Sequence, residues 1–128
     1  MISSTILIIE EHEILRRALC GWLQAIFPAA QVVEAMDQAE ALVLAQAHLP
    51  DVVIVSHSAI GGRDLQVVQQ LKTRLPMTAI VILASFVDES YRACAMAAGA
   101  SVVIPTQNVS QELQPALQAL VHSLSKLG

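Results

Sequence analysis

The sequence predicts an α/β fold, a doubly wound (βα)5 domain over residues 1–128 whose parallel strands are ordered 2-1-3-4-5. Two observations carry this prediction. Five short runs are largely apolar, which is typical of parallel strands covered on both faces. Segments with apolar residues at helical spacing alternate with these runs, and no internal repeat or linker interrupts them. Because crossovers are right-handed, we expect helices one and five to share one face of the sheet.

The first 47 residues of the chain hold two predicted strands and two predicted helices. The strands are predicted over Thr5–Ile9 and Gln31–Ala35, and the helices over Glu13–Phe27 and Asp37–Ala47. In the first helix, apolar residues recur every three or four positions from Ile14 to Ile26, and Pro28 ends the helix. Asp37 and Glu40 fit a capping box that opens the second helix.

The rest of the chain holds three predicted strands and three predicted helices. The strands are predicted over Val52–Val55, Ala79–Ala84 and Ser101–Ile104, and the helices over Arg63–Leu75, Asp88–Ala98 and Ser110–Lys126. Pro76 ends the third helix, and Gly99 suits the position just after the fourth. Ser110 is predicted to cap the last helix, whose first turn lies close to Pro115. We interpret Gly61 and Gly62 as a turn, because no phosphate-binding glycine motif surrounds them.

The composition excludes several classes of protein. Hydrophobic residues make up 55% and charged residues 14% of the chain, which excludes disorder and a disulfide scaffold. The net charge of −4 and the lack of a basic run argue against direct nucleic-acid binding by this chain. No apolar run approaches the roughly 18 residues of a membrane span, and no signal peptide opens the chain, so we expect a cytoplasmic protein. Cys20 and Cys94 lack metal spacing and are interpreted as small buried hydrophobes.

Polar residues follow several of the predicted strands. In a doubly wound sheet the functional crevice lies at the carboxyl ends of the strands. The residues at that edge are Glu10, Glu11 and His12, then Ser56, His57 and Ser58, then Ala84 and Ser85, and finally Pro105 and Thr106. The first and third strands are predicted neighbours, so Glu10 and Ser56 are expected to be close.

Four segments together resemble the response-regulator receiver domain, the CheY-like module of two-component and phosphorelay signalling. They are ILIIEEHEILR (6–16), PDVVIVSHSAIGG (50–62), AIVILAS (79–85) and AMAAGASVVIPT (95–106). The first segment is most similar to LuxR/NarL-type regulators, and the resemblance covers essentially the whole chain. It implies the flavodoxin/CheY-like fold and a signalling role without enzymatic activity.

The resemblance also assigns family positions to residues of this chain. The acidic pair that binds Mg²⁺ falls on Glu10 and Glu11, and the phosphoacceptor aspartate falls on Ser56. The Thr/Ser switch falls on Ala84, the aromatic switch on Val103 and the lysine on Thr106. Nearly every functional position therefore departs from the family's pattern.

These departures remove the chemistry of aspartyl phosphorylation. A serine hydroxyl is a weak nucleophile without an adjacent base, whereas an aspartate is already ionised. Thr106 offers no cation to the phosphoryl group, and Ala84 offers no hydroxyl to detect it. With the acceptor carboxylate lost, Glu10 and Glu11 are expected to bind Mg²⁺ weakly at best, and no other cofactor is expected. The sequence thus predicts a degenerate receiver domain, a pseudo-receiver.

Two other functions of Ser56 remain open. A bound ligand or atypical phosphorylation at Ser56 is the first, and a small hydrolase with His57 or His12 as base is the second. The hydrolase is disfavoured because Ser56 and His57, as neighbours on a strand, point to opposite faces. The sequence around Ser56 also lacks the G-x-S-x-G elbow of hydrolases.

The expected working surface is apolar. Receiver domains commonly meet partners through the fourth helix, fifth strand and fifth helix, which here makes Val87, Tyr91, Cys94 and Val103 interface candidates. We expect a protein partner or a homodimer on this surface, and no nucleic acid or membrane. A seam near Trp22 and Leu124 is the rival interface, and ordinary packing is the alternative to both.

Overall fold

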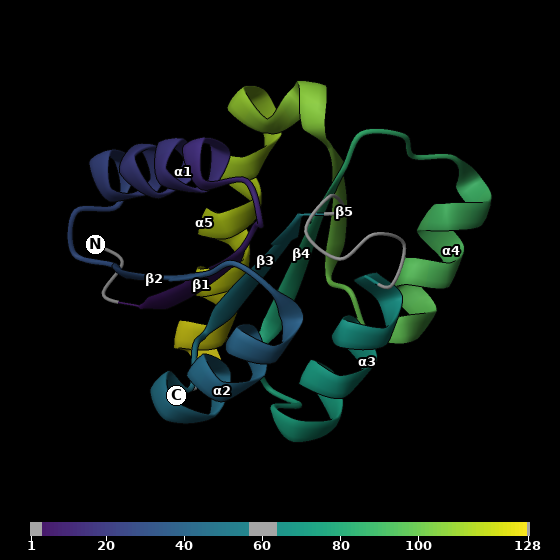
Figure 1. Cartoon of the computed structure of the whole chain (residues 1–128), viewed down its shortest axis with the longest axis horizontal. Helices are drawn as coiled ribbons and strands as arrows, with labels where there is room; N and C mark the ends of the chain where they lie inside the picture. The colour runs from purple at the N-terminus through teal and green to yellow at the C-terminus, as the bar shows by residue number, and fades with distance from the viewer. Residues whose placement is uncertain (1–3, 57–63, 128) are drawn as a thin grey trace.

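The computed structural model describes residues 4–56 and 64–127, with side chains described over 4–56 and 65–121. Its five strands form one parallel sheet ordered β2-β1-β3-β4-β5, which confirms the predicted topology (Figure 1). The strands are β1 (Thr5–Ile9), β2 (Gln31–Ala35), β3 (Val52–Ser56), β4 (Ala79–Ala84) and β5 (Val102–Pro105). The helices are α1 (Glu13–Ile26), α2 (Gln38–His48), α3 (Asp64–Arg74), α4 (Glu89–Ala98) and α5 (Val109–Leu127), with a 3-10 turn η2 (Thr106–Asn108).

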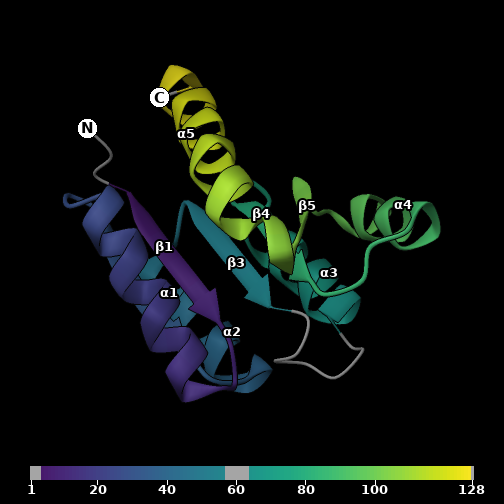
Figure 2. The same cartoon turned by 90° about the horizontal axis from the view of Figure 1, so that it is seen from above.

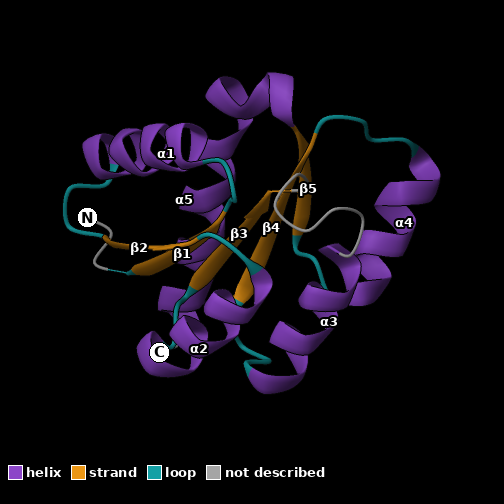
Figure 3. Cartoon of the chain, in the orientation of Figure 1, coloured by secondary structure: helices purple, strands orange, loops and turns teal. Residues whose placement is uncertain are grey.

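Helices cover both faces of the sheet, as Figures 2 and 3 show. Alternate strand residues enter two separate cores: Ile6 and Ile8 pack with α1 and α5, whereas Leu7 and Ile9 pack with α2, α3 and α4. In Figure 1, α5 runs behind the strands and α2 and α3 lie in front of them. The expectation that α1 and α5 share a face is confirmed. Among the described residues, no helix is both long and apolar enough to cross a membrane.

Side-chain caps fix where two of the helices begin. Asp37 Oδ1 accepts a hydrogen bond from Glu40 N at 2.8 Å, which confirms one arm of the predicted capping box. The other arm differs, because Glu40 Oε1 accepts from Met36 N at 2.9 Å and not from Asp37. Asp88 Oδ1 caps α4 by accepting from Tyr91 N at 2.7 Å. The chain therefore enters both helices at the predicted residues.

The end of the chain departs from the prediction in two places. β5 continues through Pro105, which an edge strand tolerates because one of its sides needs no ladder donor. The last helix begins at Val109, directly after η2, so Ser110 is not its cap. A 3-10 turn commonly precedes an α-helix and satisfies part of its first turn through the backbone. Pro115 lies inside α5 on its exposed side.

Two glycines are expected to respond oppositely to alanine. Gly99 has φ +122°, and an added Cβ would overlap the Lys72 side chain, whose Nζ donates to Thr78 O at 2.7 Å. Gly99→Ala should lower the free energy of unfolding by about 2 kcal/mol. Gly21 lies within α1 with open space around it, so Gly21→Ala should raise that free energy by about 0.5–1 kcal/mol. Urea unfolding followed by circular dichroism tests both, and equal responses would contradict the prediction.

Candidate functional site

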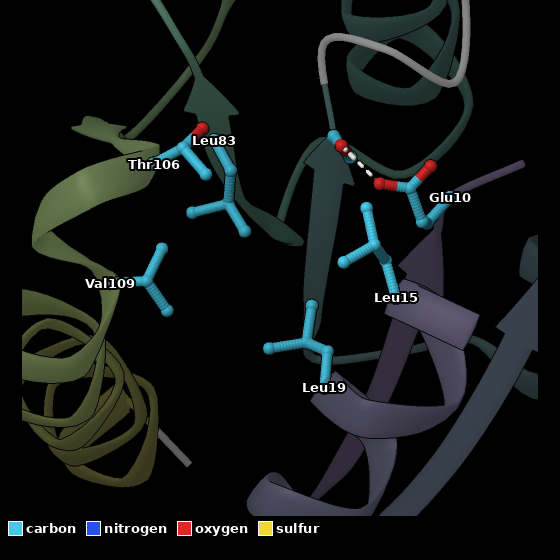
Figure 4. Close-up of a pocket in the computed structure, with 7 residues that line it drawn as sticks. Glu10, Leu15, Leu19, Leu83, Thr106 and Val109 are labelled. Carbon is cyan, nitrogen blue, oxygen red and sulfur yellow. Dashed lines mark hydrogen bonds between the residues drawn. The ribbon is translucent and has the colours of Figure 1, made fainter. Parts of the chain in front are cut away.

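A hydrogen-bonded cluster centres on Glu10, which follows β1 and is only 5% exposed. The Ser56 hydroxyl donates to Glu10 Oε1 at 2.7 Å, drawn as the dashed line in Figure 4. The backbone N–H of His12 donates to Oε2 at 3.0 Å, and His12 Nδ1 lies 3.1 Å from the same oxygen. The expectation that Glu10 and Ser56 meet across β1 and β3 is therefore confirmed.

Arg16 holds the segment between β1 and α1 in place. Its Nη1 donates to the carbonyl oxygen of Glu10 at 3.0 Å, and its Nε donates to Glu34 Oε1 on β2 at 3.1 Å. The guanidinium thus joins the first turn of α1 to both β1 and β2. Its charge is directed at Glu34 and the Glu10 backbone, and neither contact involves the Glu10 side chain.

The two cysteines differ in their surroundings. Cys20 is half-buried in α1, and burial raises the pKa of its thiol, with a smaller contribution from Glu34. A thiol in such a place is poorly reactive, which agrees with the interpretation as a packing residue. That interpretation is wrong for Cys94, which lies exposed on α4 because the core side of this helix is formed by Ala95 and Ala98.

The acidic pair is split between the interior and the surface. Glu10 is buried and holds Ser56 and His12, whereas Glu11 is exposed. Among the described residues, no group of three or more His, Cys, Asp or Glu side chains converges on a common point. Mg²⁺ prefers six oxygen ligands with carboxylates among them. One buried carboxylate and one hydroxyl fit that requirement poorly.

The positions that resemble the family's switch residues lie on two faces of the sheet. Ser56 pairs in register with Leu83, and both side chains point toward the face of the sheet that α1 and α5 cover. Thr106 lines the same hollow as these two residues. Ala84 is 1% exposed and packs in the opposite core with Val103. Glu10, Ser56 and Thr106 are therefore brought together, whereas Ala84 and Val103 are not.

A hollow of about 170 Å³ lies between α1 and the start of α5, beside Ser56 (Figure 4). Its described lining consists of Glu10, Leu15, Leu19, Ser56, Leu83, Thr106 and Val109. The four apolar members of this set are not among the predicted site residues. The available signal was the surplus of apolar side chains at the start of α1, where Ile14 and Leu15 remain largely exposed.

The described geometry does not place His12 as a base for Ser56. The Ser56 hydroxyl donates to Glu10 Oε1, while the His12 ring contacts the other carboxylate oxygen. A serine nucleophile needs the imidazole nitrogen within hydrogen-bond distance of its own hydroxyl. His57, Ser58 and the Gly61–Gly62 pair lie outside the described residues.

The interface candidates differ in how far their side chains are exposed. Val103 is 2% exposed in the core between β5 and α4, so its choice as a contact residue is wrong. The cause is the covering of both faces of β5, which buries Val103 on the α4 side and Ile104 on the α5 side. Val87 and Tyr91 are half-buried against the same core, and Cys94 is exposed. Trp22 packs partly into the α1–α5 core, and the side chain of Leu124 is not described.

Comparison with known proteins decides the family. The profile of the response regulator receiver domain matches residues 6–118. The chain belongs to this family. As a receiver domain it is 27% identical over 122 residues to the transcriptional regulatory protein LiaR of Bacillus subtilis, covering 95% of this chain and 58% of LiaR. The receiver domain thus spans just over half the length of the curated relatives it matches.

Solved structures bear out the CheY-like fold. The signal receiver domain of a DNA-binding response regulator from Colwellia psychrerythraea superimposes with a TM-score of 0.86 at 21% identity, covering 93% of this chain and 98% of that one. A LuxR-family two-component response regulator from Aurantimonas sp. gives 0.83 at 24% identity, covering 95% and 87%. Both structures agree with the fold that the resemblance implied.

Proposed function

We propose that this receiver domain is not phosphorylated on aspartate and acts by protein–protein contact within a two-component pathway. The observation that carries the proposal is the 2.7 Å bond from Ser56 to Glu10, at the position that resembles the family's acceptor. A hydroxyl stands there in place of a nucleophilic carboxylate, and its proton is directed at a buried carboxylate. As in other receivers, the role is signalling and not catalysis.

The surroundings of Ser56 support the same proposal. Phosphoryl transfer depends on positioning and on neutralising the phosphoryl charge by a metal and a cation. The described residues around Ser56 supply neither, since Thr106 is uncharged and Glu10 adds negative charge. Ala84 is also buried, and its methyl side chain has no hydroxyl that could form a hydrogen bond with a phosphoryl group. Loss of the switch is therefore expected to accompany loss of the acceptor.

Incubation with acetyl phosphate and Mg²⁺ is expected to leave the mass of the intact protein unchanged. An aspartyl phosphate would add one phosphoryl group that hydroxylamine removes. Intact-mass spectrometry before and after hydroxylamine measures both, with a phosphorylatable receiver domain treated in parallel as the positive control. A hydroxylamine-labile adduct, for example on Asp51 or Asp64, would falsify the proposal and show that the acceptor was misplaced.

Regulation through Ser56 by a ligand or by atypical phosphorylation is the second candidate. The observation that favours it is the hollow beside Ser56, whose side chain remains partly exposed. An acid-stable phosphoryl group on Ser56 in protein isolated from cells would support modification, and hydroxylamine would not remove it. For the hydrolase, His12 lacks such support as the base because it contacts Glu10, and His57 lies outside the described residues.

We propose that a domain other than this receiver carries the output of the pathway. LiaR is named as a transcriptional regulatory protein, and the chain matches just over half of it. The net charge of −4 makes this domain itself a poor partner for DNA, so we propose protein contact as its own role, in the cytoplasm. A DNA-binding output domain, if joined to it, would receive that contact.

A further inference from the structure

The outer side of α2 is apolar. Ala39, Val43 and Ala47 recur at every fourth residue, which places them on one side of the helix, and all three are exposed. Met36 and Leu49 flank the helix at its two ends and are 52% and 65% exposed, while Val43 is 68% exposed. We call these five residues the α2 face. It holds three of the eight large apolar side chains that are exposed in the described part of the chain.

The inner side of α2 is apolar as well. Ala41 and Ala45 are buried, and Leu42 and Leu44 pack partly against the same core. The adjacent α3, which lies beside α2 in front of the strands (Figure 1), differs from it. The exposed side chains described for α3 are all polar: Gln66, Gln69, Gln70, Thr73 and Arg74. Because a helix that is apolar all round is normally covered on all sides, the α2 face is suited to contact with protein.

The charges beside this face are unevenly distributed. Asp37 and Glu40 are exposed at the start of α2, and the hydrogen bonds that they accept come from neutral backbone N–H groups. His48 lies in the last turn of α2, and Arg74 ends the adjacent α3. A helix favours acidic residues at its N-terminus and basic residues at its C-terminus. An antiparallel partner helix therefore brings its basic end to Asp37 and Glu40, whereas a parallel one would bring its acidic end there.

We infer that the α2 face binds an amphipathic helix of another protein, which runs antiparallel to α2 and carries large aliphatic side chains on its contact side and Lys or Arg in its last turn. The small side chains of Ala39 and Ala47 leave room for such side chains on both sides of Val43. A second copy of this chain would bring the same small side chains and bury less apolar surface. The inference rests on the proposed role in protein contact but not on the loss of aspartyl phosphorylation, so either can fail alone.

A synthetic peptide tests this surface directly. The peptide has about 14 residues, or roughly four helical turns, with leucine at every third or fourth position, glutamate in its first turn and lysine in its last. A lactam bridge on the other side holds it helical. In a titration of ¹⁵N-labelled protein followed by NMR, saturable shifts are expected at the amides of Ala39, Val43 and Ala47, with a dissociation constant of roughly 10 μM to 1 mM. The same peptide with its two charges exchanged should bind about three-fold more weakly.

Three variants locate the contact on the protein. Val43→Glu places a charge at the centre of the α2 face and should weaken the peptide by about ten-fold or more. Ala18→Glu is the matched control, since it adds the same charge at an exposed apolar position of α1, across the sheet, and its affinity should equal that of the wild type. Glu40→Gln keeps the oxygen that accepts from Met36 N and removes the charge, so the two peptides should then differ less in affinity.

Several results would overturn the assignment. They are the absence of saturation by the peptide, shifts that map away from the α2 face, or equal affinity of Val43→Glu and the wild type. Equal binding of the two peptides to the wild type would overturn the antiparallel orientation. Sedimentation without peptide tests the other occupant, because a dimer that Val43→Glu abolishes would show that a second copy covers the α2 face. Val43 is 68% exposed, so its replacement leaves the packing of the core in place.

Discussion

Ser56→Asp is expected to lower the free energy of unfolding by roughly 2–3 kcal/mol at neutral pH without divalent cations. The Ser56 hydroxyl lies 2.7 Å from Glu10 Oε1, and Glu10 is buried. An aspartate at this position exchanges a hydrogen-bond donor for a second negative charge beside a carboxylate that has little access to water. Restoring the family's acceptor alone is therefore expected to destabilise the fold and not to restore switching.

The pH dependence of this effect has a definite sign. Each carboxylate disfavours ionisation of the other, so the pKa of the pair in the folded variant lies above that of the same carboxyls in the unfolded chain. The variant's loss of unfolding free energy relative to the wild type is therefore largest above the folded pKa, and it shrinks as the pH falls through that pKa. Mg²⁺ should recover part of the loss, because a cation that binds only the folded state stabilises it.

Urea unfolding at several pH values, with and without Mg²⁺, measures these effects. Ser56→Asn is the matched control, since it has the size of aspartate without the charge and should respond to neither pH nor Mg²⁺ in this way. Equal stability of the two variants at neutral pH would show that residue 56 and Glu10 do not face one another.

The fold was predictable because its signals are local and mutually consistent. Runs such as Val52–Val55 are apolar on both faces, and only a sheet covered on both sides buries them. The proximity of Glu10 and Ser56 followed from the order of the strands alone. The start of α5 did not, because η2 uses backbone bonds that leave no side-chain signal.

The rest of the site depends on packing between distant segments. The hollow exists because Leu15 and Leu19 stand apart from Val109, which lies about 90 residues later in the chain. The spacing of apolar residues in the sequence does not predict how much space remains between two packed helices. The error at Val103 was avoidable. An antiparallel strand often has one face exposed to solvent, but helices cover both faces of this parallel sheet, so Val103 and Ile104 are buried on opposite sides of it.

Constitutive association through α4 is the second large effect expected. A phosphoryl group shifts a receiver by its different contacts in two states. Under the proposed loss of aspartyl phosphorylation, no such shift takes place. A binding surface held in one state is then the most useful arrangement. The α4 surface, which we define by five uncharged exposed residues on and just before α4, suits this role. They are Phe86, Ala93, Cys94, Met96 and Ala97. Those five side chains are uncharged and Phe86 is 77% exposed, so their own burial costs little polar desolvation, while Asp88 and Glu89 are exposed beside them.

Cys94→Glu is expected to weaken homodimerisation at least ten-fold, or by about 1.4 kcal/mol, because it places a charge within a surface that becomes buried. Cys94 is the suitable position, since it is exposed, whereas Tyr91 is half-buried and its replacement would also disturb the core. Val43→Glu on α2 adds the same charge at an exposed apolar site and should leave dimerisation unchanged. Sedimentation at micromolar concentration, with and without acetyl phosphate, measures the three proteins. A monomeric wild type would contradict the assembly, and equal dimerisation of Cys94→Glu would exclude the α4 surface and favour the seam near Trp22.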